Sequence, residues 1–392
     1  MSIDTQQPAS GIPEVVFIRE QPDRETLTLP DTWDTVFLAG DADFTQESII
    51  AENKEKRNSY AMQEGVLAAY KTGTFSFPTN LKMSGVLSNT PRCAPLLKSV
   101  LGRETVNPGV DVQYEHYRRG DPLVYCTILF KKEIETELIL GALVNKLSLK
   151  INGDILNATW DGFFSRKYRA GTDETAAEIN GTSTPVTVIP LTIDAMNFDI
   201  GAYIVVGSDD NTGAGFKITG KDEIAKTLTI EGGVSTLQPA GSIVQGWAPV
   251  VQVSGVDVVG TIGDFKIDRG SLQPFDILSA TLDIDNGFKE LETIKSSSLY
   301  PKYTGRGKRK VSFNFDDYEN IDNINLKEYA RRYASLPCEI NVGDEPGNIL
   351  TIALPTFKPA SAKSSGSEEK KQSVSGQCYP DTGDDESTFV FK

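Results

Sequence analysis

The sequence predicts a mainly β protein with one or two short helices, and two alternating segments carry this prediction. In Leu278–Asp285, apolar residues alternate with Ser, Thr and Asp, which is the period of a half-buried strand. Val311–Phe315 repeats the alternation after a polar, basic loop, so the two segments predict an antiparallel pair. Elsewhere, short apolar runs are separated by Gly-rich or Asn-Gly turns. We therefore expect a core that is a β-sandwich or a barrel.

Two short helices are expected beside these strands. The first should begin at Pro95 and end before Gly102, because Pro suits the first helical turn and Gly the C-terminal cap. The second should begin after Asp322–Asn325, which offers N-cap side chains, and end near Leu336 because Pro337 follows. Its apolar residues recur with helical spacing and should pack on the sheet. They are Leu326, Tyr329, Ala330 and Tyr333.

The chain of 392 residues is long for one domain, and its composition changes in the middle. Residues 171–254 lack Cys, are rich in Gly and Thr, and are expected to form an inserted small β-barrel or immunoglobulin-like domain. The insertion divides the core into residues 1–170 and 255–392. Near the C-terminus, the Ser-, Lys- and Glu-rich segment Lys358–Gln372 is expected to be a loop. The strands expected in the insertion are Val186–Ile189, Tyr203–Val206, Phe216–Ile218, Thr227–Ile230 and Ser242–Val244.

The composition argues against several classes of function. The formal net charge of −15 is unsuited to general nucleic-acid binding, because affinity for phosphates comes from Lys and Arg. The only histidine, His116, lies in a predicted strand, and the four scattered cysteines are expected to be buried and reduced. Gly305–Lys310 lacks the residues of a phosphate-binding loop. We therefore expect no enzymatic activity, no metal and no cofactor.

Two segments resemble the major tail tube proteins of long-tailed bacteriophages. Asn89–Gly102 contains a Pro-x-x-x-Pro-Leu-Leu helix region, as in that family. Leu278–Leu336 contains a Tyr-Pro and a glycine-rich basic loop before an aromatic strand and a helix, in the family's order. The resemblance covers roughly residues 60–165 and 255–392, and rests on the pattern and order of these segments.

The resemblance implies a structural virion protein, made in the host cytoplasm and located in the phage tail. Six subunits would form a ring, and stacked rings would form a hollow conduit through which viral DNA passes without specific binding. Other implied partners are the tape measure, tail terminator and baseplate or tip proteins, with no membrane. Insertions lie on the outside of the tube in this family, so residues 171–254 are expected there.

Length and charge select two arms, Ile49–Lys71 and Lys302–Lys310, as contacts between subunits. Asp283 and Asp285 lie on the polar side of their strand, and one hypothesis places them on a negative lumen that repels DNA. A solvated turn explains these two residues equally well. The candidate contact residues are Lys54, Lys56, Arg57, Lys302, Arg306, Lys308, Arg309 and Lys310.

Two other classes of protein share parts of this pattern. A virion baseplate protein or adhesin with an immunoglobulin-like insertion would have similar strands but would form no long tubes. A carbohydrate-active enzyme would need a pair of carboxylates about 5–10 Å apart in a cleft. The sequence favours the tail tube subunit over both.

Overall fold

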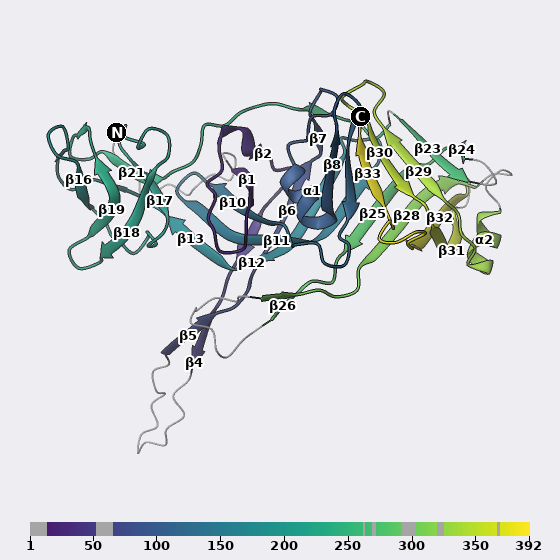
Figure 1. The fold of residues 1–392 in the computed structure, drawn as a ribbon, viewed down its shortest axis with the longest axis horizontal. Helices are drawn as coiled ribbons and strands as arrows, with labels where there is room; N and C mark the ends of the chain where they lie inside the picture. The colour runs from purple at the N-terminus through teal and green to yellow at the C-terminus, as the bar shows by residue number, and fades with distance from the viewer. Residues whose placement is uncertain are drawn as a thin grey trace, which may run out of the picture.

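The computed structural model describes residues 14–51, 66–261, 263–268, 272–291, 303–319, 325–366 and 369–392. Within these ranges the chain forms 33 strands, two α-helices and one short 3₁₀-helix, η1 (Thr32–Asp34), so the prediction of a mainly β fold is confirmed (Figure 1). No helix in this part of the chain is long and apolar enough to span a membrane.

The largest sheet has twelve strands, and all of its pairs are antiparallel. Eight of them lie side by side across the centre of the molecule: β3 (Asp43–Thr45), β6 (Gly73–Asn80), β12 (Asn157–Phe164), β11 (Thr136–Ile151), β25 (Ser279–Asp285), β28 (Lys310–Tyr318), β32 (Lys371–Cys378) and β31 (Phe357–Ser365). The other four are β1 (Val15–Gln21), β2 (Thr35–Val36), β10 (Tyr125–Lys131) and β13 (Arg166–Ala170). The predicted pair of Leu278–Asp285 and Val311–Phe315 is confirmed as β25 and β28.

Strand β11 serves two regions of this sheet because two extra residues bend it. Opposite β10, strand β11 has one extra residue between Ile139 and Ala142, where Gly141 has a φ of 66°. Opposite β12, Asn145 is a second extra residue of β11. Bulges of this kind bend a strand and raise its twist. Residues before Gly141 therefore pair with β10 and β13, and those after Asn145 pair with β12 and β25.

A second sheet packs on the inner face of the first, so the core is a β-sandwich and neither sheet is closed into a barrel. The Phe265 ring centroid lies 5.9 Å from that of Phe313 and 5.3 Å from that of Phe315, which joins the two sheets. In order, the second sheet contains β24 (Leu272–Phe275), β23 (Gly263–Asp268), β29 (Cys338–Val342), β30 (Leu350–Leu354), β33 (Thr388–Phe391), β9 (Asp111–His116) and β8 (Gly102–Asn107).

Helix α1 (Ala94–Leu101) packs against β11, β8 and β9 and contributes to the same core. It has Pro95 in its first turn and ends where Gly102 adopts a φ of 110°, as predicted. The backbone N–H of Val144 donates to Ser99 Oγ at 2.9 Å, so the helix satisfies a buried donor beside the second bulge of β11.

Helix α2 (Leu326–Arg332) lies beside β31 and is shorter than predicted (Figure 1). It ends before Leu336 because Tyr333 adopts a left-handed φ of 52° and stops the helix one turn early. Of the predicted apolar stripe, only Leu326 is buried, and Tyr329 is partly buried against the core. The helix therefore contacts the sandwich at one end of its apolar stripe.

The loop predicted for Lys358–Gln372 is wrong, because most of this segment belongs to β31 and β32. The two strands pair along their length, from Phe357 opposite Cys378 to Ser365 opposite Lys371. Their outward residues are Ser, Lys and Gln, and a register shift after Pro359 interrupts the alternation. A polar strand with a bulge resembles a low-complexity loop in sequence, which explains the wrong prediction.

The third sheet lies within the predicted insertion, at the end of the molecule opposite α2 (Figure 1). Phe198 and Phe216 are completely or almost completely buried in an apolar cluster of its own. Beyond its two end strands, Thr175 and Leu191 form one isolated β-bridge, and the sheet is not closed into a barrel. The strands are, in order, β14 (Thr172–Glu174), β21 (Ile243–Gly246), β17 (Tyr203–Val206), β18 (Phe216–Asp222), β19 (Thr227–Val234) and β16 (Val186–Pro190), so each of the five predicted strands is present.

Four two-stranded ribbons complete the described structure, and one of them projects from the body (Figure 1). Apart from Ser48, the projecting ribbon falls within the predicted arm Ile49–Lys71, whose residues 52–65 lie outside the described ranges. The ribbons are β4 (Ser48–Ala51) with β5 (Val66–Tyr70), β26 (Lys289–Leu291) with β27 (Tyr303–Gly305), β7 (Lys82–Met83) with β22 (Val256–Asp257), and β15 (Ile179–Asn180) with β20 (Leu237–Gln238).

Replacing Gly141 with Ala should lower the free energy of unfolding by about 3 kcal/mol, because a left-handed residue and overpacking each destabilise the fold. A Cβ at Gly141 would lie 2.6 Å from Ser165 Oγ and 2.8 Å from the Arg24 carbonyl oxygen. Gly109→Ala is the matched control, because Gly109 has a φ of 73° but no atom within 4 Å of an added Cβ. The control should lose only about 1 kcal/mol in urea denaturation. Equal losses would contradict close packing at the bulge.

Candidate functional site, a polar face of the large sheet

The outward side of the eight central strands carries mostly Ser, Thr, Asn, Gln, Asp and Lys, and we call it the polar face. Along β25, the inward residues are buried in the sandwich and the outward ones are partly exposed. The same alternation continues on β28 and β32. An antiparallel sheet commonly buries one face and solvates the other, so the polar face is the side available to water or to a partner. Its residues on β25 are Ser279, Thr281, Asp283 and Asp285.

The strand register arranges these polar residues in rows across the sheet. Lys146 Nζ lies 3.2 Å from Asp285 Oδ2 on the neighbouring strand. In the next row, Ser148 Oγ donates to Asp283 Oδ1 at 2.6 Å. Both aspartates that the lumen hypothesis selected therefore lie on the polar face, each beside a partner in its own chain. The first row runs from β3 to β28 through Asp43, Ser76, Asp161, Lys146, Asp285 and Lys310.

The polar face carries nearly balanced charge, although the whole chain is strongly acidic. Its acidic residues are Asp43, Asp161, Asp283, Asp285 and Asp316. Its basic residues are Lys146, Lys150, Lys310, Lys358, Lys363 and Lys371. The face as a whole therefore has no negative excess. A balance of Asp and Lys weakens the attraction of the whole face for a polyanion, because strong binding to phosphates requires an excess of cations.

Two shallow hollows lie on the polar face. One, of about 310 Å³, lies at the second bulge of β11 and is lined by Asp43, Lys146 and Asp161. The other, of about 280 Å³, lies over β25, β28, β32 and β31 and includes Asn314 and Lys363. No group of three or more His, Cys, Asp or Glu residues suited to a metal occurs in the described parts of the chain. The hollows thus present hydrogen-bonding groups to solvent.

The basic loop, which sequence analysis assigned to contacts between subunits, is largely attached to its own chain. Arg309 donates to Asp384 Oδ1 at 3.0 Å and to Glu386 Oε2 at 2.6 Å. The Arg306 guanidinium lies 5.1 Å from the centroid of the Tyr117 ring. These contacts fix the two arginines against the body.

The remaining candidate contact residues fall into two groups. Lys308 and Lys310 are exposed, and Lys310 belongs to the polar face. Their contact with a neighbouring subunit stays a prediction. The candidates outside the described residues are Lys302, Lys54, Lys56 and Arg57.

The β26–β27 ribbon that leads into the basic loop is held by a buried ion pair. The side chains of Arg24 and Glu290 pair with each other, and each is 8% exposed. Thr304 Oγ1 accepts from Arg24 Nη1 at 3.0 Å and donates to Glu290 Oε1 at 2.8 Å. Removing one member of a buried pair would leave an uncompensated charge, so this network fixes the base of the loop. The sequence gives no signal for this network, because Arg24 and Glu290 are distant in sequence and no local pattern joins them.

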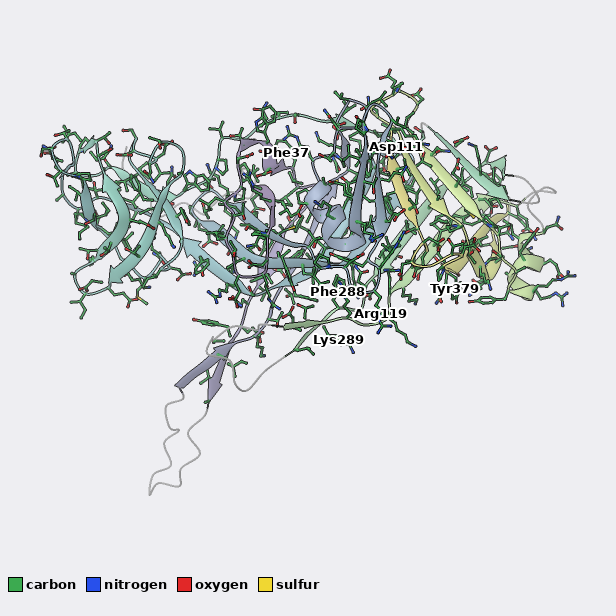
Figure 2. The ribbon with its side chains drawn as sticks, viewed as in Figure 1. Phe37, Asp111, Arg119, Phe288, Lys289 and Tyr379 are labelled. Carbon is green, nitrogen blue, oxygen red and sulfur yellow. The ribbon has the colours of Figure 1, made fainter. Side chains whose placement is uncertain are left out.

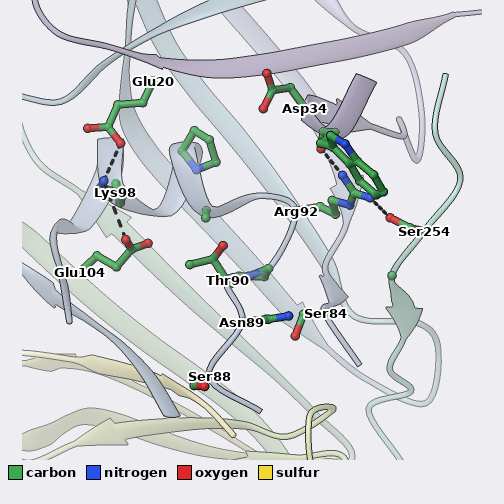
Figure 3. Close-up of a pocket in the computed structure, with 15 residues that line it drawn as sticks. Glu20, Asp34, Ser84, Ser88, Asn89, Thr90, Arg92, Lys98, Glu104 and Ser254 are labelled. Atoms are coloured by element: carbon green, nitrogen blue, oxygen red, sulfur yellow. Dashed lines mark hydrogen bonds and ion pairs between the residues drawn. The ribbon is translucent and has the colours of Figure 1, made fainter. Parts of the chain in front are cut away.

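A third hollow, of about 700 Å³, lies beside α1 (Figure 3). Trp33 is 64% exposed at this hollow, and the Arg92 guanidinium lies 5.2 Å from its ring centroid. Arg92 also donates to the Trp33 carbonyl oxygen. Lys98 Nζ lies 2.5 Å from Glu20 Oε2 and 3.9 Å from Glu104 Oε1. Both cations of the hollow are therefore bound within the chain.

His116 lies in the core of the sandwich rather than in a cleft. It is fully buried, and its Nε2 lies 2.8 Å from Ser387 Oγ. Burial, and then the charge of the nearby Arg309, hold the pKa of His116 well below its usual value. The ring is therefore neutral at pH 7. The prediction of buried cysteines is confirmed, because all four are buried and free.

Comparison with protein-family models finds no match to this chain, and comparison with curated proteins finds none. The likeness to tail tube proteins therefore rests on the two segments described above, and the polar face is the feature of the structure from which a function can be inferred.

Replacing His116 with Gln should remove one pH dependence of stability. The pKa of His116 is lowered on folding, so the unfolded chain takes up the proton first as the pH falls below about 6.5. This residue should stabilise the fold fully above pH 6.5, and about 1.4 kcal/mol of that contribution should be lost between pH 7.5 and 5.5. Urea denaturation at both pH values should show this loss in the wild type and its absence in the variant. Parallel pH profiles would contradict the assignment.

Proposed function

We propose that this protein is the subunit of a hollow assembly, a tail tube through which viral DNA passes. The polar face supports this proposal most strongly. It is a continuous hydrophilic surface of eight strands whose other side is buried in a sandwich. Copies joined edge to edge with this face inward would enclose a bore that is lined by hydroxyl, amide and balanced charged groups.

The margins of the large sheet also favour an assembly. Among the described residues, strands β31 and β3 each pair with a single neighbouring strand, so each has one edge without a strand partner, and helix α2 lies beside β31. Within the described residues, the Leu336 N–H donates a hydrogen bond of 2.7 Å to the carbonyl oxygen of Phe357, the first residue of β31. Free edges expose unpaired N–H and C=O groups that attract further strands. A closed ring joins each margin to the opposite margin of the next copy and leaves no edge.

The near-neutral charge of the polar face suits a conduit. A lining rich in Lys and Arg would release counterions from DNA and bind it tightly, which would oppose movement. At the centre of the face, Lys146 is held beside the anion of Asp285. DNA would meet a hydrated surface with little net attraction.

The projecting β4–β5 ribbon supports contacts beyond one ring (Figure 1). Ile50 on this ribbon is 60% exposed, although β4 is a strand with an apolar centre. A projecting two-stranded ribbon also offers its strand edges to a partner. We therefore assign this ribbon to contact with a neighbouring copy.

Electron microscopy of the purified full chain in negative stain, over a range of protein concentrations, tests this function. Rings or tubes with a central bore are the expected result. A chain that stays monomeric at high concentration would contradict the proposal. Discrete complexes without a bore would instead favour the alternative, a baseplate or adhesin protein with an immunoglobulin-like insertion.

A further inference from the structure

The charges of the polar face are sorted between its two margins. On the described strands β31 and β32, this face carries three lysines and no acidic residue: Lys358, Lys363 and Lys371. On the described strands β3, β6 and β12, it carries two aspartates and no basic residue: Asp43 and Asp161. The central strands hold three residues of each sign: Lys146, Lys150 and Lys310 with Asp283, Asp285 and Asp316.

The margin charges are largely unpaired in the described parts of one copy: Asp161 has Lys146 opposite it on β11, but Lys146 pairs with Asp285. None of the five margin residues forms an ion pair in the described parts of the chain, unlike the central pair of Lys146 and Asp285. At about 4.8 Å per strand spacing, the outermost strands β3 and β31 are about 34 Å apart along the sheet, and the inner margin strands β12 and β32 about 19 Å. Both separations exceed the screening length of about 8 Å at physiological ionic strength, so the margins interact little with each other.

Aromatic contacts hold one of the margin lysines in place. Lys358 Nζ lies 5.6 Å from the ring centroids of both Tyr333 and Tyr379. The two tyrosine hydroxyls lie 2.5 Å apart (Tyr379 in Figure 2). A cation held between aromatic rings loses less side-chain freedom when it meets an anion. The lysine margin is therefore prepared for a negatively charged partner.

We propose that the β31–β32 margin of one copy docks beside the β3–β12 margin of a second copy, so that the lysines of one face the aspartates of the other. This inference rests on the proposed function. It identifies which two margins meet between neighbouring copies, and we call this contact the seam. Like margins repel, which disfavours a two-fold dimer through one margin. Opposite margins attract, so each added copy presents a fresh margin of the required sign until a ring closes.

Two charge-reversed variants test the seam. The first carries Lys358→Glu, Lys363→Glu and Lys371→Glu, so that both of its margins are negative. The second carries Asp43→Lys and Asp161→Lys, so that both of its margins are positive. Lys150→Glu is the matched control, because Lys150 is an exposed residue of the same face on a central strand. Circular dichroism checks that each variant is folded.

Each margin variant alone should need at least a tenfold higher protein concentration than the wild type for half-assembly, measured by light scattering in about 50 mM salt. An equimolar mixture of the two should assemble within about twofold of the wild type, because every seam in an alternating ring again joins opposite charges. The control should match the wild type. The tenfold difference should shrink in about 500 mM salt, where screening is stronger.

Three results would overturn the seam. Single variants that assemble as well as the wild type would show that margin charge has no role. Folded variants whose mixture does not recover assembly would show that the margins do not meet. In both cases a wild type that forms rings would leave the proposed function intact, whereas a wild type that forms no assembly would overturn the function and the seam together.

Discussion

The burial of one side of the large sheet against the second sheet is the constraint on which the rest of the structure depends. Phe313 and Phe315 point into the sandwich, so Ser312 and Asn314, which alternate with them along β28, must point out. A register shift of one residue would exchange the two sets and expose the aromatic rings. The apolar core therefore determines the polar face, and with it the surface that a partner or a bore would meet.

Local pattern predicted the parts of the fold that short segments determine. The alternation of Leu278–Asp285 and the Pro95 and Gly102 signals were sufficient for β25 and α1, because each depends on neighbours in sequence. The C-terminus of α2 depended on the backbone conformation of Tyr333, for which the sequence has no signal as clear as a glycine. At its N-terminus, Asn325 makes no side-chain cap, and the rest of Asp322–Asn325 lies outside the described residues.

The candidate site was harder to predict than the strands, because it is made by pairing between distant segments. Asp43 and Asp161 share a row only because β6 lies between β3 and β12. Lys363 and Lys371 were assigned to a loop, so no local pattern indicated that they lie on a sheet margin. Summed charge was also misleading, since an acidic chain presents a nearly balanced face. What a sheet offers to a partner depends on its register more than on its composition.

Thiol labelling tests most directly whether the polar face lines a bore, since the four natural cysteines are buried. Thr281→Cys places a thiol at the centre of the polar face, and Thr187→Cys places one on an exposed position of β16 in the third sheet. In assembled protein, the Thr281→Cys thiol should react with a small maleimide but be protected from a large polyethylene glycol maleimide, whereas the Thr187→Cys thiol should react with both. A Thr281→Cys thiol that reacts with the large reagent equally fast in the assembly and in the free subunit would contradict the account.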